Sequence, residues 1–316
     1  MSYRSQITKS VGYASKITMV LITISLLAIS VLSATTHGQI NLASSNKIVI
    51  TARNVNLNKN SIQNNSVLPV NSDVFFVLVI GNDYRPGVDG KRADAIHLIG
   101  VNPTANKVSM LDFPRDTNVN IPGHGKNKIN AANAFGGSEL TAQTIEQLTG
   151  VKISYTLETD FAGFTGLINS LGGLEVTVDR PMHDKGSGSN FDPGTIHMDG
   201  GAALAFSRDR HSFTTGDLER SRNQGQLLIY ALREMQNVKN KTQNKFEAAY
   251  LISKNIQLTN LSLSDVFYMM ELASDIKIEE ISNITVPWQG SNTLAPIAND
   301  LFNDFKDNAI IDTYGK

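Results

Sequence analysis

Cysteine is absent from this 316-residue chain, which excludes disulfides, thiol catalysis and thiolate metal sites. A strong excess of one charge is also missing, because 28 Lys and Arg residues face 29 Asp and Glu residues. That balance argues against nucleic acid as a partner, since proteins that coat it carry a broad basic surface. The sequence has neither a P-loop nor the G-x-S-x-G motif of serine hydrolases. Apolar residues make up 41% of the chain, which is enough for a substantial buried core.

The N-terminal part contains one long hydrophobic run, residues 17–34, without a charged side chain. A helix of that length spans about 27 Å, close to the thickness of the hydrocarbon layer of a bilayer. Because Arg4, Lys9 and Lys16 precede it, we expect the residues before the run to stay in the cytoplasm and the remainder to lie outside. We favour an uncleaved membrane anchor over a secretory signal peptide, since Leu32 fits the small-residue cleavage pattern poorly.

Four segments follow from this interpretation: a cytoplasmic tail (1–16), a single transmembrane helix (17–34), an extracellular linker (35–72) and a folded catalytic domain (73–316). The linker is rich in Asn, Ser and Thr, a composition typical of spacers. Its apolar piece KIVIT predicts a short strand that packs back on the folded domain. The predicted location is the cell membrane, with the C-terminal domain extracellular.

Three apolar runs of strand length follow the linker: residues 74–80, 95–101 and 107–113. The turn-forming sequence NPTAN separates the second run from the third, so the three runs predict an antiparallel meander. In a meander, the end of the first strand, the start of the second and the end of the third lie at the same edge. We therefore expect Asp83, Asp94 and Arg115 to meet at that edge of the sheet.

Apolar spacing and turn residues predict the remaining elements: helices over 138–148, 160–171 and 218–235, and a strand over 174–178. In the last helix Asp217 is placed to cap the N-terminus. Arg220 and Gln224 are four residues apart and project from one face of it. Strands and helices in this order predict an α/β fold, with a mixed central β-sheet flanked by helices.

The segment ALAFSRDRHSFTTGDLERSRNQGQLL concentrates arginines to a degree that no ordinary core requires. It contains four guanidinium groups, a carboxylate and an amide: Arg208, Arg210, Arg220, Arg222, Asp217 and Gln224. Guanidinium groups are permanently charged and form paired hydrogen bonds with phosphate, so the segment predicts a phosphate-binding site. Exposed ion pairs are the alternative for the arginines, and a helix cap paired with a neighbouring arginine is the alternative for Asp217.

An ordered series of motifs extends over most of the predicted extracellular part: GNDYR, KRADAIHLIGVNP, SMLDFPRDTNVNIPG, KINAANAFGG, LGGLEVTV, LAFSRDR and GDLERSRNQ. This series resembles the LytR-CpsA-Psr family. The resemblance implies a three-layer α/β/α domain behind one membrane helix, and transfer of an anionic glycopolymer from a polyprenyl-pyrophosphate carrier to peptidoglycan. The implied partners are the lipid-linked glycan, the peptidoglycan acceptor and membrane lipid. Which glycopolymer is carried, whether teichoic acid, capsule or arabinogalactan, stays open.

The resemblance also assigns roles to individual residues. It implies a Mg²⁺ site at Asp83 and Asp94, with Arg92 beside it as a substrate-binding residue. The catalytic set falls on the PRD, R-x-R and D-x-x-R motifs: Arg115, Arg208, Arg210, Asp217 and Arg220. Gln224 and Asn223 are expected to bind substrate, and Asn223 stands where many members have a second arginine. Arg222 is one residue out of that helical phase and would point about 100° away, so no role is carried over to it.

Arginine and Mg²⁺ would together neutralise the pyrophosphate and stabilise the leaving group, while a carboxylate serves as general base. The residues do not decide which of Asp83, Asp94 and Asp217 is that base. A peptidoglycan hydroxyl as acceptor makes the protein a phosphotransferase, whereas water as acceptor makes it a polyprenyl-pyrophosphate hydrolase. A noncatalytic regulatory protein that binds lipid pyrophosphate is the third possibility.

Overall fold

The computed structural model describes residues 48–53, 74–83, 92–241, 256–259, 273, 276–290, 292–309 and 311. Its elements, in chain order, are β1 (Ile48–Ala52), β2 (Phe75–Asn82), β3 (Ala93–Asn102), β4 (Lys107–Asp112), β5 (Asn118–Ile121), β6 (Gly125–Lys128), α2 (Ala131–Thr149), β7 (Ile153–Thr159), α3 (Phe161–Ser170), β8 (Leu174–Val178), β9 (Met182–Asp184), β10 (Ser189–Phe191), β11 (Gly194–Met198), α4 (Gly200–Arg208), α5 (Asp217–Lys241), β12 (Ile256–Thr259), the 3₁₀ helix η2 (Ile278–Glu280), β13 (Ser282–Thr285), β14 (Trp288–Gln289), β15 (Thr293–Leu294) and α8 (Ile297–Asn308).

A seven-stranded mixed sheet forms the centre of the fold, in the order β12-β1-β7-β2-β3-β4-β13. β3 runs antiparallel to both β2 and β4, which confirms the predicted meander. β7 is parallel to β2, and β13 is parallel to β4. The strand predicted over 174–178 is β8, which pairs with β11 outside this sheet.

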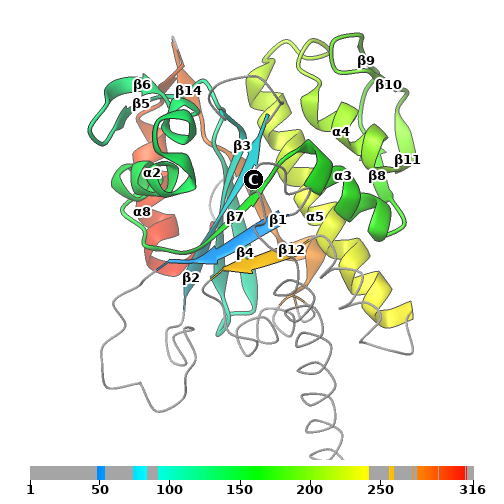
Figure 1. Cartoon of the computed structure of the whole chain (residues 1–316), viewed down its shortest axis with the longest axis horizontal. Coiled ribbons are helices and arrows are strands. Elements are labelled where there is room, and N and C mark those ends of the chain that lie inside the picture. Colours follow the sequence, from blue (N-terminus) through cyan, green and yellow to red (C-terminus); the bar gives the residue numbers. More distant parts are fainter. Residues whose placement is uncertain are drawn as a thin grey trace, which may run out of the picture. The chain divides into compact units, whose positions relative to one another are not determined.

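Helices lie on both sides of this sheet (Figure 1), with α2 and α8 on one side and α3, α4 and α5 on the other. Alternation along β2 explains the first layer, because Leu78 and Ile80 point into a core shared with α2 and α8. A second core lies among α3, α4, α5 and β8, and it includes Ile168 and Phe206. The predicted arrangement, a mixed sheet flanked by helices, is confirmed.

The helix ends follow from local chemistry. The Asp160 side chain accepts a hydrogen bond from the Gly163 N–H at 2.8 Å, which caps α3 as its sequence predicts. α2 begins earlier than predicted, because it includes a bend at Gly136 and Gly137 that interrupts its helical geometry. Gly137 has φ +65°, a backbone conformation that residues with a Cβ rarely adopt. Asp217 is the first residue of α5.

The predicted strand within the linker is β1, which is antiparallel to β7 and parallel to β12. Its position in the sheet confirms that this apolar piece packs back on the folded domain. The predicted membrane helix, residues 17–34, lies outside the described residues. Within the part of the chain that the structure describes, no helix is long and apolar enough to cross a membrane.

Beyond β4 the chain contributes to a second, four-stranded sheet in the order β14-β15-β5-β6. The Trp288 indole Nε1–H donates to Thr117 Oγ1 at 2.9 Å, which joins this sheet to the turn after β4. β5 and β6 form an antiparallel hairpin, and all four residues of β6 are exposed. This hairpin starts directly beside the predicted site.

Candidate functional site

The edge of the central sheet where β2 ends carries a β-bulge between Gly81 and Asn82, with Asp94 opposite it in β3. The Asp83 N–H donates to the carbonyl oxygen of Arg92 at 3.3 Å, which keeps the two strand ends together. Bulges at sheet edges redirect side chains and are common next to functional sites. Asp83 and Asp94, the two predicted metal ligands, therefore belong to adjacent strands at one edge.

Arg115 reaches this edge from the turn after β4. Its Nη1 donates to Asp94 Oδ1 at 2.7 Å, and each of the two side chains is 23% exposed. Burial opposes the charged form of Arg115, but the hydrogen bond that Arg115 donates to Asp94 and the negative charges of Asp94 and Asp217 outweigh it and raise the pKa of the guanidinium. The predicted meeting of Asp94 with Arg115 is confirmed.

The first turn of α5 adds an acidic and a basic side chain to the same place. Asp217 forms an ion pair with Arg220, and its Oδ1 lies 3.8 Å from Arg115 Nε. Burial lowers the pKa of the Arg220 guanidinium, against the attraction of Asp217. Burial likewise raises the pKa of Asp217, against the attraction of Arg220. The start of α5 is thus joined to β3 through a chain of four alternating charges.

Gln224 lies one turn further along α5 on the same face as Arg220, as its spacing predicts. Its Nε2 donates to the carbonyl oxygen of Ser207 at 3.0 Å and lies 3.5 Å from the carbonyl oxygen of Asp94. The amide therefore connects the C-terminal end of α4 with β3. We refer to Asp94, Arg115, Asp217, Arg220 and Gln224 together as the arginine site.

Several buried polar atoms here have no hydrogen-bond partner among the described residues. The donors are Arg115 Nε and Arg220 Nε; the acceptors are Asp217 Oδ2 and Gln224 Oε1, and Asn223 Nδ2 is a further partnerless donor on the side of α5 that faces the Arg222 hollow. Buried polar groups are normally paired, so these atoms are open to hydrogen bonds with water or with a bound molecule. Donors on two guanidinium groups suit an anion rich in acceptors, such as a phosphate.

The other predicted arginines are not part of this contact network. The Arg208 guanidinium lies over the Phe161 ring, 5.3 Å from its centroid. Arg210 is exposed, and its Nε donates to His211 Nε2 at 3.0 Å. Arg92 is exposed as well. Of these three arginines, none forms an ion pair with another residue that the structure describes.

Arg222 belongs to a different face of α5, as its helical phase predicts. Its side chain is 46% exposed, with Nη1 3.4 Å from Glu219 Oε2 and Nη2 3.8 Å from Asp179 Oδ2. It lines a surface hollow with Asn223 and Phe213, and its contacts are those of a solvent-exposed ion pair. The structure therefore separates Arg222 from the arginine site.

Asp209, the residue between the two arginines of the R-x-R motif, was not anticipated from the sequence. It is fully buried and accepts hydrogen bonds from Ser189 Oγ at 2.5 Å and from Ser212 Oγ at 2.8 Å. These bonds attach the motif to β10 and hold the backbone from which Arg208 and Arg210 project. The signal in the sequence was the alternating charge of R-D-R, since the side chain of the middle residue points away from the side chains of its two neighbours.

A buried pair beneath α5 was also missed. His97 in β3 and Asp112 in β4 are cross-strand partners, and His97 Nδ1 lies 2.6 Å from Asp112 Oδ1. Burial raises the pKa of Asp112 to about 6, while His97 and Asn283 act in the opposite direction. Gly225 of α5 packs directly on this pair, since a Cβ there would lie 2.5 Å from Asp112 Oδ1.

The fit of a metal ion depends on the carboxylates at the sheet edge. Among the described residues, no group of three or more His, Asp or Glu side chains is arranged to hold a metal. Mg²⁺, however, is commonly held by one or two carboxylates together with substrate phosphates and water. Asp83 and Asp94 supply two such carboxylates at this edge, and Arg115 links Asp94 to Asp217, whose Oδ2 has no hydrogen-bond partner among the described residues. This donor set fits Mg²⁺ bound together with a phosphate, rather than a metal held by the protein alone.

Comparison with known proteins identifies relatives over most of the chain. The LytR_cpsA_psr family model matches residues 33–307. The polyisoprenyl-teichoic acid–peptidoglycan teichoic acid transferase TagU of Bacillus cereus (strain AH820) is 33% identical over 220 residues, which are 69% of this chain and 71% of the relative. Two solved structures are similar. B. subtilis TagV (TM-score 0.62, 26% identity) matches over 73% of this chain and 95% of its own. The LytR-Csp2A-Psr enzyme from Actinomyces oris (TM-score 0.63, 23% identity) matches over 73% and 89% and shares the fold. The sequence and the fold agree, and the chain belongs to the LytR-CpsA-Psr family.

Proposed function

We propose that this chain is a phosphotransferase that moves an anionic glycopolymer from a polyprenyl-pyrophosphate carrier to a hydroxyl of peptidoglycan. The observation that carries the proposal is the pair of buried donors, Arg115 Nε and Arg220 Nε, that have no hydrogen-bond partner among the described residues. A pyrophosphate presents only acceptor oxygens and negative charge, so it would satisfy both of them. The relative TagU is named for transfer of a polyisoprenyl-linked teichoic acid to peptidoglycan, which supports the same class of reaction.

Each arginine then has a stated task. Arg115 and Arg220 would hold the pyrophosphate at the arginine site and neutralise the charge that develops on the leaving lipid phosphate. Arg208 and Arg210 would approach from the end of α4, which Gln224 holds next to Asp94 through the Ser207 carbonyl. Arg92, Asn223 and Gln224 would bind and orient the substrate rather than stabilise the leaving group.

Asp217 is the carboxylate best suited to act as general base. Its pKa is raised by burial, and a carboxylate with a higher pKa is a stronger base. Its Oδ2 has no hydrogen-bond partner among the described residues, whereas Asp94 Oδ1 is engaged by Arg115. In this assignment Asp217 Oδ2 takes the proton of the attacking peptidoglycan hydroxyl, while Oδ1 remains paired with Arg220.

Asp83 and Asp94 would hold Mg²⁺ when the donor is present. The ion would supply Lewis-acid polarisation of the phosphate oxygens and a counter-charge for them. Asp94 would also keep Arg115 in place, because the hydrogen bond from Arg115 to Asp94 fixes the direction of its guanidinium.

The predicted anchor, residues 17–34, would hold the domain at the outer face of the cell membrane. A lipid carrier and the peptidoglycan are both within reach there. Membrane attachment is therefore part of the proposal, since a carrier with a long prenyl chain does not leave the bilayer.

The test uses the full chain in detergent or nanodiscs with a polyprenyl-pyrophosphate-linked glycan, peptidoglycan oligomers and Mg²⁺, and follows products by mass spectrometry. We expect glycan coupled to peptidoglycan through a phosphodiester. Arg220→Ala should abolish coupling, and Arg222→Ala is the matched control, because it removes a neighbouring guanidinium whose ion pairs within the described part of the chain are with Glu219 and Asp179.

The products separate the three candidate functions. Coupled product lost in Arg220→Ala supports the phosphotransferase. Free phosphorylated glycan without coupling would replace it with the hydrolase. Donor binding that Arg220→Ala weakens, with no product under any condition, would replace both with the noncatalytic binding protein.

A further inference from the structure

A surface outside the arginine site combines positive charge with an exposed aromatic ring. Residues 117–137, which form the β5–β6 hairpin and the start of α2, contain no Asp or Glu. Lys126 and Lys128 lie on β6, which is exposed throughout. Two residues apart on a strand, they repeat positive charge on one side at a spacing of about 7 Å. Together with His124 and Phe135 they form what we call the basic ledge.

Phe135 is unusual because its side chain is left in solvent. It is 47% exposed, and among the described residues only it and Ile297 are large hydrophobic side chains exposed to this degree. Its ring stacks on the His124 imidazole, with centroids 4.5 Å apart and planes 13° from parallel. The bend at Gly136 and Gly137 ends the first turn of α2 directly after Phe135. The two rings therefore form a flat, ordered platform instead of part of the core.

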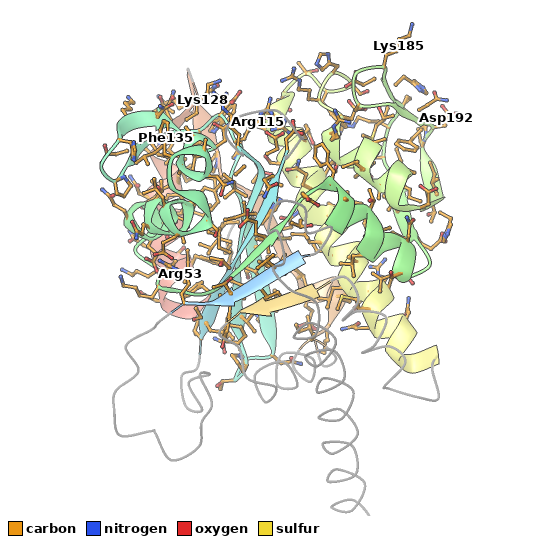
Figure 2. All side chains as sticks on the ribbon, viewed as in Figure 1. Arg53, Arg115, Lys128, Phe135, Lys185 and Asp192 are labelled. Carbon is orange, nitrogen blue, oxygen red and sulfur yellow. The ribbon has the colours of Figure 1, made fainter. Side chains whose placement is uncertain are left out.

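The ledge is attached to the arginine site by short contacts. Lys128 Nζ lies 3.1 Å from Asp116 Oδ1, next to Arg115 in the chain. The Asn130 N–H donates to the carbonyl oxygen of Arg115 at 3.2 Å. Figure 2 shows Phe135, Lys128 and Arg115 along the same edge of the domain in that view, with Lys185 far from them. The ledge thus lies next to the arginine site, within reach of a chain held there.

We infer that the basic ledge binds the glycopolymer part of the donor, a chain of sugars or polyols with repeated phosphate groups. Lys126, which has no ion pair among the described residues, and Lys128, which shares its charge with Asp116, match repeated anions on the polymer, and this attraction is long-ranged and screened by salt. The carbon-bound hydrogens of a sugar or polyol carry slight positive charge and pack on the negative face of an aromatic ring. This inference rests on the proposed function, and it adds a second binding surface that specifies a phosphate-bearing polymer.

The test measures binding of a lipid-free glycerol-phosphate oligomer to the full chain by calorimetry at low and at moderate salt. This probe lacks the pyrophosphate and the lipid, so binding that Lys126→Gln or Phe135→Ala weakens and Arg220→Ala does not is binding at the ledge. Lys126→Gln and Phe135→Ala should each weaken binding about threefold to tenfold, and added salt should weaken it further. Lys185→Gln is the matched control, since Lys185 is an exposed lysine on the β9–β10 turn and should change nothing. Both ledge residues are exposed, so the melting temperature should stay that of the wild type.

Two results would overturn the inference. One is equal binding of the oligomer by the wild type and by both ledge variants. The other is tighter binding of an uncharged peptidoglycan glycan strand than of the phosphate oligomer, which would make the ledge an acceptor surface. Arg220→Ala separates this inference from the proposed function, because it should abolish transfer yet leave oligomer binding intact. If the wild type binds the oligomer but transfers no glycan, the proposed function is refuted and the inference about the ledge still holds.

Discussion

Gly225 in the third turn of α5 offers the sharpest test of how the arginine site is positioned. A Cβ at this position would lie 2.5 Å from Asp112 Oδ1 and 2.7 Å from the side-chain nitrogen of Asn283. Carbon and oxygen atoms that are not bonded rarely approach closer than about 3.3 Å. Gly225→Ala therefore requires a displacement of roughly 0.8 Å, either of α5 or of the buried carboxylate.

The carboxylate has little room to move. Asp112 is fully buried and held by His97, and Asn283 Nδ2 also donates to the carbonyl oxygen of Arg222 at 3.4 Å. We therefore expect α5 to shift and to carry Arg220 with it. A misplacement of about 1 Å near a reacting group can cost about 10²-fold in rate. We predict that Gly225→Ala lowers the transfer rate between tenfold and a hundredfold.

We expect only a modest loss in the free energy of unfolding. Overpacking a core costs about 1–3 kcal/mol, and replacing glycine by alanine inside a helix returns about 1 kcal/mol. The net loss in the free energy of unfolding is thus between zero and about 2 kcal/mol. Gly201→Ala in α4 is the matched control, because its Cβ would lie 3.4 Å from Asp199 Oδ1, an ordinary contact.

The assay compares transfer rates and urea unfolding for the two glycine variants, and for Gly225→Ala combined with Asp112→Ser. The shorter serine makes room for the new methyl group, so the double variant should recover part of the rate and show non-additive energies. A Gly225→Ala protein with full activity and higher stability would refute the reasoning. The higher helix propensity of alanine would then outweigh any clash of the new methyl group with Asp112.

Three further predictions concern neighbouring groups. Because the pKa of Asp112 is raised to about 6, the folded state binds its proton more tightly than the unfolded state, so its contribution to stability is present below about pH 4 and is lost as the pH rises through 6. Thermal unfolding between pH 4 and 8 should accordingly show a smaller loss of stability with rising pH for Asp112→Asn than for the wild type, and parallel curves would contradict the assignment. Arg220→Lys keeps the charge but loses the planar donor fork, so donor affinity should fall at least tenfold in a binding titration, and wild-type affinity would mean that charge alone suffices. Asp209→Ala leaves the hydroxyls of Ser189 and Ser212 without their acceptor, so urea unfolding should show a loss of about 1–3 kcal/mol; an unchanged midpoint would show that these bonds do not hold the motif.

Local patterns predicted most of the elements that carry the site. The apolar runs around β2, β3 and β4 and the turn between the last two are determined by neighbouring residues, so the meander and the contact between Asp94 and Arg115 could be anticipated. The register of β3 and β4 also implies the pair of His97 and Asp112, which was missed. A turn that pairs Asn102 with Lys107 also places His97 opposite Asp112, because paired positions in an antiparallel ladder move apart in equal steps.

The arginine motifs were predicted to meet at one site, but in the structure the arginines fall into two groups by their contacts. Arg115 and Arg220 share a network with Asp217, whereas Arg208 lies over Phe161 and Arg210 is exposed. Motif spacing names the residue types that a phosphate site needs. It does not measure the distance between α4 and α5, which depends on side chains packed between them.

What the sequence by itself determined are the properties that depend on residues close together in the chain: the strands, the helices, the phase that turns Arg222 away, and the arginine-rich chemistry. Only the tertiary structure decided that Gly225 lies against the buried His97–Asp112 pair, that Asp209 is enclosed by two serines, and that Phe135 stays in solvent beside His124. The physical reason is that these contacts join elements distant in sequence. Their geometry follows from packing and register across the whole fold, and no local periodicity encodes it.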